Sequence, residues 1–190
     1  MTSSTHATGH EPPLFGEGGS LRHVLLVGGD EHEWAAMTAE RWQRRAAELG
    51  AYCAELGVAW LTILIYGSEA GVASPGPTRR YEVSGCTVTV DGFGNGHQRF
   101  AEAMWRIAPD ADINEKNVAA ALYAPAEDEP DLVVVLGPST QLPPSLVWEL
   151  AYAELVFLPT SWADMSAAHL ASAVAAFALR RRRFGGLDPD

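Results

Sequence analysis

Residues 131–162 read DLVVVLGPSTQLPPSLVWELAYAELVFLPTSW, and the run 132–136 near the start of this stretch is apolar throughout. Such a run is typical of a strand whose two faces are both covered, because neither face then needs polar residues. Runs that are nearly continuously apolar or β-branched occupy residues 23–27, 60–66 and 86–90. We therefore predict four strands of a central parallel sheet.

Longer amphipathic stretches alternate with these runs, which is the pattern of an α/β fold with helices on both sides of the sheet. A helix is predicted over 33–56, with one apolar face made of Ala35, Trp42, Ala46, Leu49, Cys53 and Leu56. A second helix is predicted near 101–107. Residues 70–85, AGVASPGPTRRYEVSG, are rich in Gly and Pro and are predicted to form a loop.

Composition limits the possible functions. With 190 residues, of which 47% are hydrophobic, we predict one domain over 21–190 after a flexible N-terminal tail over 1–20. The tail has neither a basic start nor an apolar core, so no secretory signal or transmembrane segment is predicted there. The net charge of −11 argues against nucleic acid or an anionic membrane as a broad-surface partner. Cys53 and Cys86 match no metal-ligand spacing, and a reducing cytoplasm fits them best.

Residues 131–186 resemble the cis-prenyltransferases, the family of undecaprenyl diphosphate synthases, nearly position by position. Active members carry an Arg in the strand that follows Asp-Leu-Val and an Arg-x-Ser-Asn run before the Leu-x-Trp helix. Val135, Gln141, Pro143 and Pro144 stand at these positions here. The resemblance therefore implies the family's fold without these diphosphate-binding residues.

The first loop departs from the family as well. Family members read His-Val-x-x-x-Met-Asp-Gly-Asn-Gly-Arg-Trp-Ala, and His23, Val24, Trp34 and Ala35 fix the register. The family's metal-binding Asp then falls on Gly29, and its diphosphate-binding Arg falls on Glu33. A carboxylate repels a diphosphate, since like unit charges 4 Å apart interact by about 4 kcal/mol at an effective dielectric of 20.

The segment after the second strand is too short for the two long helices that wall the prenyl tunnel in active members. The resemblance therefore implies a cis-prenyltransferase-like fold that lacks the tunnel helices. In sheets of this type the working site lies beyond the carboxyl ends of the strands, which here means the segments after Val27, Tyr66 and Leu136.

Two other parts of the family pattern are retained. Six residues match the helix and strand that form the family's dimer, with ordinary core packing as the alternative: Trp148, Tyr152, Glu154, Leu155, Phe157 and Trp162. Arg183, Phe184 and Gly185 match the terminal Arg-x-Gly, which in family dimers completes the partner's isopentenyl diphosphate site. The resemblance thus implies substrate binding by these three residues, with Arg183 and Gly185 assisting catalysis in trans. The alternative for the run 180–183 is a set of cations at a helix C-terminus.

Residues 30–33, Asp-Glu-His-Glu, allow two interpretations. They could form a new metal or acid/base cluster at the sheet edge, or a helix cap with Asp30 as the N-cap and two acidic residues in the first turn. Glu154 matches the family's second metal-binding carboxylate, but with Gly29 in place of the first we expect no metal ligands in this chain. The glycine run 92–96 is expected to be a turn rather than a phosphate cradle.

Taken together, these features predict a catalytically silent accessory subunit of a heterodimeric cis-prenyltransferase, similar to the Nogo-B receptor type. The partner would be the catalytic subunit, with Mg²⁺ in the partner's site and no cofactor bound by this chain. The expected location is the cytoplasm, with any membrane contact supplied by the partner. The alternatives are a self-sufficient short-chain condensing or cyclising enzyme, a non-catalytic regulatory binding protein, and, for assembly, a homodimer.

Overall fold

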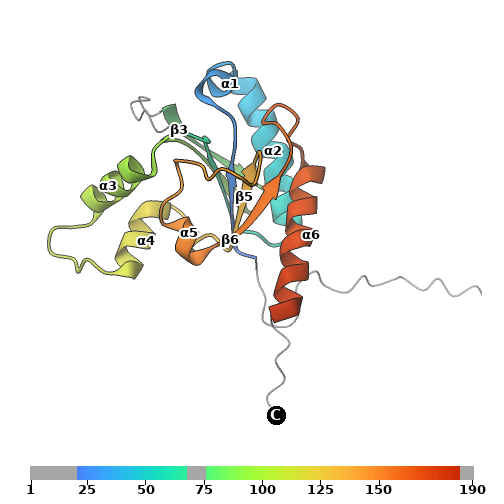
Figure 1. Ribbon diagram of the computed structural model, residues 1–190. Coiled ribbons are helices and arrows are strands. Elements are labelled where there is room, and N and C mark those ends of the chain that lie inside the picture. Colours follow the sequence, from blue (N-terminus) through green and yellow to red (C-terminus); the bar gives the residue numbers. More distant parts are fainter. Residues whose placement is uncertain (1–20, 68–75, 185–190) are drawn as a thin grey trace, which may run out of the picture.

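A computed structural model describes residues 21–67 and 76–184, without the side chains of 76–77 and 181–184. It contains one six-stranded sheet in the order β3-β4-β2-β1-β5-β6 (Figure 1). The strands are β1 His23–Val27, β2 Trp60–Leu64, β3 Gly76–Val83, β4 Cys86–Gly92, β5 Leu132–Leu136 and β6 Glu154–Leu158. All pairings are parallel except that of β3 with β4. The predicted α/β fold with a central, mostly parallel sheet is confirmed.

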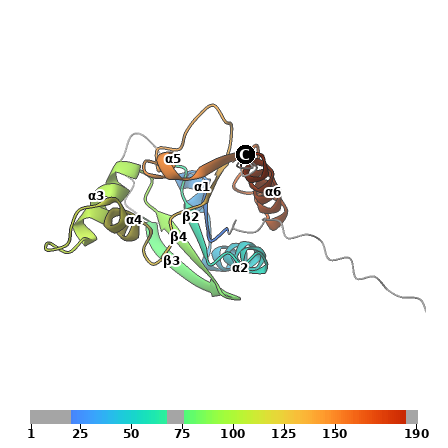
Figure 2. The ribbon, with the colours of Figure 1, turned by 90° about the horizontal axis from the view of Figure 1, so that it is seen from below.

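Helices cover both faces of the sheet (Figure 2). The helices are α1 Glu31–Ala35, α2 Ala39–Glu55, α3 Gly96–Arg106, α4 Glu115–Tyr123, α5 Glu149–Tyr152 and α6 Ala167–Phe184. Figure 2 shows α2 and α6 on one side of the sheet, with α3 and α4 on the other. Within the described residues, no helix is both long and apolar enough to span a membrane.

The central strands feed two apolar cores because successive side chains of a strand point to opposite faces. Val24 and Leu26 of β1 pack in a first core with α2 and α6, whereas Leu25 and Val27 pack in a second core with α4. Strands β1 and β5 are buried at every position. This double burial explains why their sequences, apart from His23, are apolar without alternation.

The predicted helix 33–56 is in fact two helices. The helix is interrupted before Thr38, whose side chain accepts a hydrogen bond from the Arg41 backbone N–H at 3.3 Å and caps the N-terminus of α2. The predicted apolar face of α2 is correct in its middle, where Trp42, Ala46, Leu49 and Cys53 are all buried, and the Cys53 thiol is free.

The predicted loop over 70–85 was wrong for its second half, which forms β3. Ser84 and Gly85, with φ of 50° and 93°, make a two-residue connection that pairs Val83 with Cys86. Hairpins favour this kind of turn because its twist matches that of the strands. Of the stretch between β2 and β4, the described residues 65–67 and 76–85 contain no helix. Other bounds also shift: β2 ends at Leu64, β4 runs on to Gly92, and α3 begins at Gly96.

His23 places a polar ring in the interior at the start of β1. Its Nδ1 lies 2.7 Å from the Asp128 carbonyl oxygen and its Nε2 lies 2.8 Å from the Thr62 hydroxyl. The side chain is fully buried, and this burial lowers its pKa from 6.5 to about 4. The ring is therefore neutral in the folded protein at neutral pH.

This neutral ring predicts a specific acid sensitivity. The unfolded chain takes up the proton first, so His23 leaves stability intact above pH 6.5 and lowers it as the pH falls from 6.5 to 4. The expected loss of unfolding free energy is about 3 kcal/mol over this window. Urea unfolding of His23→Gln should lack this part of the pH dependence, whereas His97→Gln, at an exposed position, should keep it. Parallel pH profiles for wild type and His23→Gln would contradict the assignment.

Candidate functional site

The carboxyl end of β1 turns sharply at Gly28 and Gly29. Gly29 has a φ of +77°, in the left-handed region that favours glycine. The Trp34 indole N–H donates to the Gly28 carbonyl oxygen at 2.9 Å and so folds α1 back over this turn. The family's metal-binding Asp would stand on this turn.

Three indole rings pack beside the turn, and we call Trp34, Trp42 and Trp162 the tryptophan cluster. Their ring centroids are 4.9, 5.8 and 5.5 Å apart. The Arg45 guanidinium lies 4.7 Å from the Trp162 ring centroid and donates to the Trp162 carbonyl oxygen at 2.8 Å. The cluster is therefore held from α2 as well as from the segment after β6.

The tryptophan cluster closes the position of Gly29. A Cβ atom on Gly29 would lie 2.7 Å from the Trp34 Nε1 and 2.8 Å from the Trp162 Cγ. Both distances are shorter than real side chains allow, and the rings are too tightly packed to move freely. An Asp side chain does not fit at this position without displacing the cluster.

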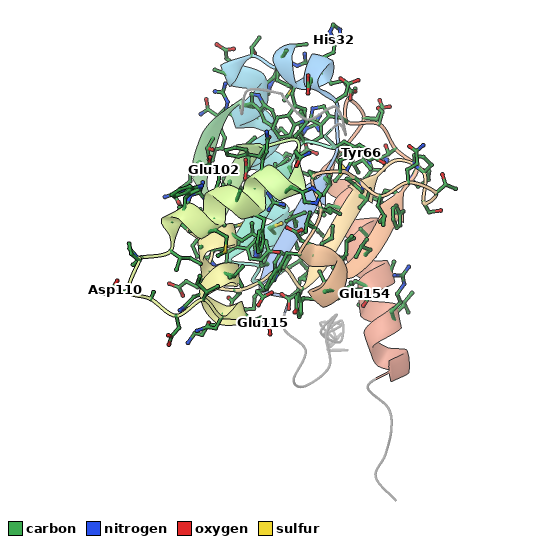
Figure 3. The ribbon with its side chains drawn as sticks, turned by 60° about the vertical axis from the view of Figure 1, so that its left-hand side comes forward. His32, Tyr66, Glu102, Asp110, Glu115 and Glu154 are labelled. Atoms are coloured by element: carbon green, nitrogen blue, oxygen red, sulfur yellow. The ribbon has the colours of Figure 1, made fainter. Side chains whose placement is uncertain are left out.

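The acidic residues that follow form a helix cap. The Glu33 backbone N–H donates to the Asp30 carboxylate at 2.8 Å, and the Asp30 backbone N–H donates to the Glu33 carboxylate at 3.0 Å. This reciprocal capping box is the second of the two interpretations of residues 30–33. Glu31 and His32 are exposed, and Figure 3 shows His32 at the top of the molecule, apart from Tyr66.

The residues at this edge do not fit Mg²⁺. Gly29 offers no ligand, and the part of the chain that the structure describes contains no group of three or more His, Cys, Asp or Glu side chains that could hold a metal ion. Glu154 opens β6 and so lies at the opposite edge of the parallel sheet, where it accepts a hydrogen bond from Arg180 at 3.2 Å. Val135 is fully buried, and Gln141 is exposed.

The segments after β2 and β5, two of the three that the sequence singled out, meet at this edge of the sheet, and the segment after β4 joins them. The Ser145 hydroxyl donates to the Tyr66 carbonyl oxygen at 3.2 Å, and the Gly96 N–H donates to the Pro144 carbonyl oxygen at 2.8 Å. Asn95 accepts from the N–H groups of His97 and Gln98, so the glycine run 92–96 is a short connection from the end of β4 to a helix cap. These groups bind one another rather than presenting donors to a phosphate.

A buried ion pair that the sequence did not predict lies beneath these segments. Arg99 and Glu149 are 5% and 1% exposed, and the Arg99 Nη1 lies 3.0 Å from the Glu149 Oε1. Asp91 at the end of β4 is 3.8 Å from the Arg99 Nε. Burial acts to lower the pKa of Arg99, but the Glu149 and Asp91 carboxylates outweigh it and raise that pKa, so the guanidinium stays charged.

The residues predicted to form a dimer interface fall into two groups. Trp162 is 3% exposed and belongs to the first core, so in this chain it is a core residue. The others lie on α5 and β6. Trp148 is half-buried, is stacked on Phe100 and donates to the Glu129 carboxylate at 3.1 Å, while Tyr152 is 53% exposed.

We define the α5–β6 face by Leu150, Tyr152, Leu155 and Phe157. Leu150 is 43% exposed, and Leu155 and Phe157 are half-buried against the second core. Strand β6 is at the end of the sheet order, so within the described residues its outer edge pairs with no strand. Arg183 and Phe184 end the backbone of α6, but their side chains, like all of Gly185, lie outside the described residues.

A sequence model described as Putative undecaprenyl diphosphate synthase matches residues 82–185, which is more than half of the chain. The chain belongs to this family. It is 39% identical over 98 residues to Isoprenyl transferase 2 of Bradyrhizobium diazoefficiens, covering 47% of this chain and 39% of that protein. It is 41% identical over 80 residues to the ditrans,polycis-undecaprenyl-diphosphate synthase of Lactiplantibacillus plantarum, covering 40% and 30% of the two chains. The matched part thus spans well under half of each relative.

Solved structures of prenyltransferases share the fold. A probable undecaprenyl diphosphate synthase from Campylobacter jejuni superposes with a TM-score of 0.56 at 15% identity, covering 88% of this chain and 99% of that one. Lavandulyl diphosphate synthase from Lavandula x intermedia gives a TM-score of 0.56 at 17% identity, covering 86% and 98%. The undecaprenyl diphosphate synthase fold therefore extends through β1 and α2, beyond the matched residues.

The lack of room at Gly29 predicts that Gly29→Ala destabilises the protein more than Gly57→Ala does. Gly57 has nearly the same φ, +76°, but in the described structure nothing lies within 4 Å of an added Cβ. Gly57→Ala should lose about 1 kcal/mol of unfolding free energy, from backbone strain alone. Gly29→Ala should lose about 2 kcal/mol more, because the added atom overpacks the tryptophan cluster. Chemical denaturation of both variants measures the difference, and equal losses would contradict the closure.

Proposed function

We propose that this chain is a catalytically silent accessory subunit of a heterodimeric cis-prenyltransferase. Its partner, a catalytic subunit, binds Mg²⁺ and an allylic diphosphate and condenses the latter with isopentenyl diphosphate. The observation that carries the proposal is Gly29, which has no side chain and no room for one beside Trp34 and Trp162. A catalytic chain of the family needs a carboxylate at this position, and Gly29 cannot supply it.

The rest of the first loop also supports the proposal that this chain has no catalytic activity of its own. Glu33, in place of the family's diphosphate-binding Arg, is held by the backbone N–H of Asp30 and presents negative charge to the edge of the sheet. The capping box also weakens the alternative of a self-sufficient enzyme with a rebuilt site, because Asp30 and Glu33 are already engaged with backbone N–H groups. Between β2 and β4, where the family resemblance implies two tunnel helices, the described residues form β3 and no helix.

The α5–β6 face supports a partner. It joins exposed apolar and aromatic side chains, Leu150 and Tyr152, to the outer edge of β6. Aromatic residues are enriched in protein interfaces, and an uncovered edge strand invites pairing or covering. In the family resemblance this helix and strand form the dimer. The catalytic subunit is the preferred partner, because a second copy of this chain would bring no catalytic loop to the complex.

Arg183 and the Gly185 backbone are assigned to the partner's isopentenyl diphosphate site. The guanidinium stays charged at all physiological pH values and binds two phosphate oxygens with its planar fork. The role comes from the family's terminal Arg-x-Gly motif, in which Phe184 takes the middle position.

Co-expression with the synthase of the same organism that has an intact Asp-Gly-Asn-Gly-Arg loop tests the proposal. We expect a 1:1 complex that is more active than the synthase alone. Arg183→Ala should lower the activity of that complex without dissociating it. A purified chain that forms only homodimers and binds no synthase would overturn the proposal. A complex whose activity is unchanged by Arg183→Ala would instead support a regulatory binding protein.

A charge placed on the α5–β6 face should prevent assembly. Leu150→Asp is expected to weaken synthase binding by about a hundredfold, since an unpaired carboxylate would be buried at the interface. Trp105→Asp is the control, because Trp105 is also an exposed apolar residue, at 85%, but lies near the end of α3 and is not part of this face. Affinity measured by biolayer interferometry should be unchanged for the control. Equal affinities for both variants would exclude α5 from the interface.

A further inference from the structure

Helix α5 carries the two most exposed residues of the proposed interface, but little in its own sequence holds it in place. It has only four residues, and in the described structure its N-cap, Trp148, makes no side-chain capping bond. Helices this short are unstable in water without tertiary contacts. Its one buried residue is Glu149, so a carboxylate anchors the helix, together with the N-cap Trp148, which stacks on Phe100.

Glu149 is held on both of its oxygens. Its Oε1 accepts from the Arg99 guanidinium at 3.0 Å, and its Oε2 accepts from the Val147 backbone N–H at 3.2 Å. The same Arg99 nitrogen donates to the Ser145 carbonyl oxygen at 2.8 Å. One guanidinium therefore fixes both the entry to α5 and its first residue.

Arg99 is itself fixed to the sheet. It lies in α3, whose first residue, Gly96, donates to the Pro144 carbonyl oxygen at 2.8 Å. A Cβ on Gly96 would lie 2.3 Å from the Val147 Cγ2, so this close approach requires glycine. Asp91, at the end of β4, faces the Arg99 Nε at 3.8 Å. The chain of contacts runs from the carboxyl edge of the sheet to α5.

From these contacts we infer that the Arg99–Glu149 ion pair is the positioning element of the partner-binding surface: it fixes α5 so that Leu150 and Tyr152 are presented in one orientation. This inference rests on the proposed function for the identity of the partner, but not for the positioning itself. Well-packed apolar residues can replace a buried ion pair with little loss of stability, and some buried pairs contribute orientation instead. Apolar residues would fill this space, but they could not form the hydrogen bonds and ionic contacts that Arg99 and Glu149 make.

The double variant Arg99→Met with Glu149→Leu separates positioning from stability. We expect it to fold with a melting temperature within a few degrees of wild type, because both charges leave together. Its α5 amides, 149–152, should exchange hydrogen about tenfold faster, and its affinity for the co-expressed synthase should fall about tenfold. Arg106→Met, an exposed arginine on the same helix, is the control and should change neither quantity.

The two readouts keep the inference separate from the proposed function. Hydrogen exchange needs no partner, so a wild-type chain that binds no synthase would sink the proposed function and leave the positioning test intact. Unchanged exchange and unchanged affinity in a folded double variant would overturn the inference alone. If the double variant does not fold, Glu149→Gln decides, because it keeps the volume and removes only the charge. Faster α5 exchange in that variant, with slow exchange retained in β1 and β5, is the expected result, and unchanged α5 exchange would contradict the inference.

Discussion

The packing of indole rings against the bare backbone of Gly29 is the contact on which the character of this protein depends. Trp34 reaches Gly29 from α1 and Trp162 reaches it from the connection between β6 and α6, while Trp42 of α2 packs against both rings. Segments far apart in the chain therefore meet at the carboxyl end of β1. Because this end is where parallel sheets of this type bind ligands, the same contact that stabilises the fold also fills the place where a metal carboxylate would stand.

The polar groups at the carboxyl edge of the sheet are engaged in contacts within the protein. The carboxyl edge of the sheet is rich in hydrogen bonds, but they join Tyr66, Asn95, Pro144 and Ser145 to backbone or to one another. The ion pair between Arg99 and Glu149 is buried and links this edge to α5. On our proposal, groups at the carboxyl edge of the sheet, where active members bind ligands, support the surface that faces the partner.

The sequence predicted the parts of the fold that follow from burial. Strands β1 and β5 are covered on both faces, so their apolar runs marked them clearly. The β3 strand was missed because glycines and prolines preceded it, although Tyr81-Glu82-Val83 before a Ser-Gly turn carries the alternation of a hairpin. The interruption at Thr38 was missed because threonine occurs both at helix N-caps and within helices, so its presence in an amphipathic stretch does not mark a boundary.

Parts of the site could be predicted and parts could not. Resemblance located Gly29 and Glu33, but no pattern showed that tryptophans would close over the glycine, since the rings come from three separate segments. Arg99 and Glu149 look like solvated charges, and only their tertiary setting buries them. Trp162 fitted core and interface equally well until its exposure was known.

The most direct test of the central claim is calorimetric titration of the purified chain alone with an allylic diphosphate, farnesyl diphosphate, in the presence of Mg²⁺. A chain whose first loop is closed by the tryptophan cluster should show no saturable heat up to millimolar ligand. Saturable, Mg²⁺-dependent binding in the micromolar range would contradict the account.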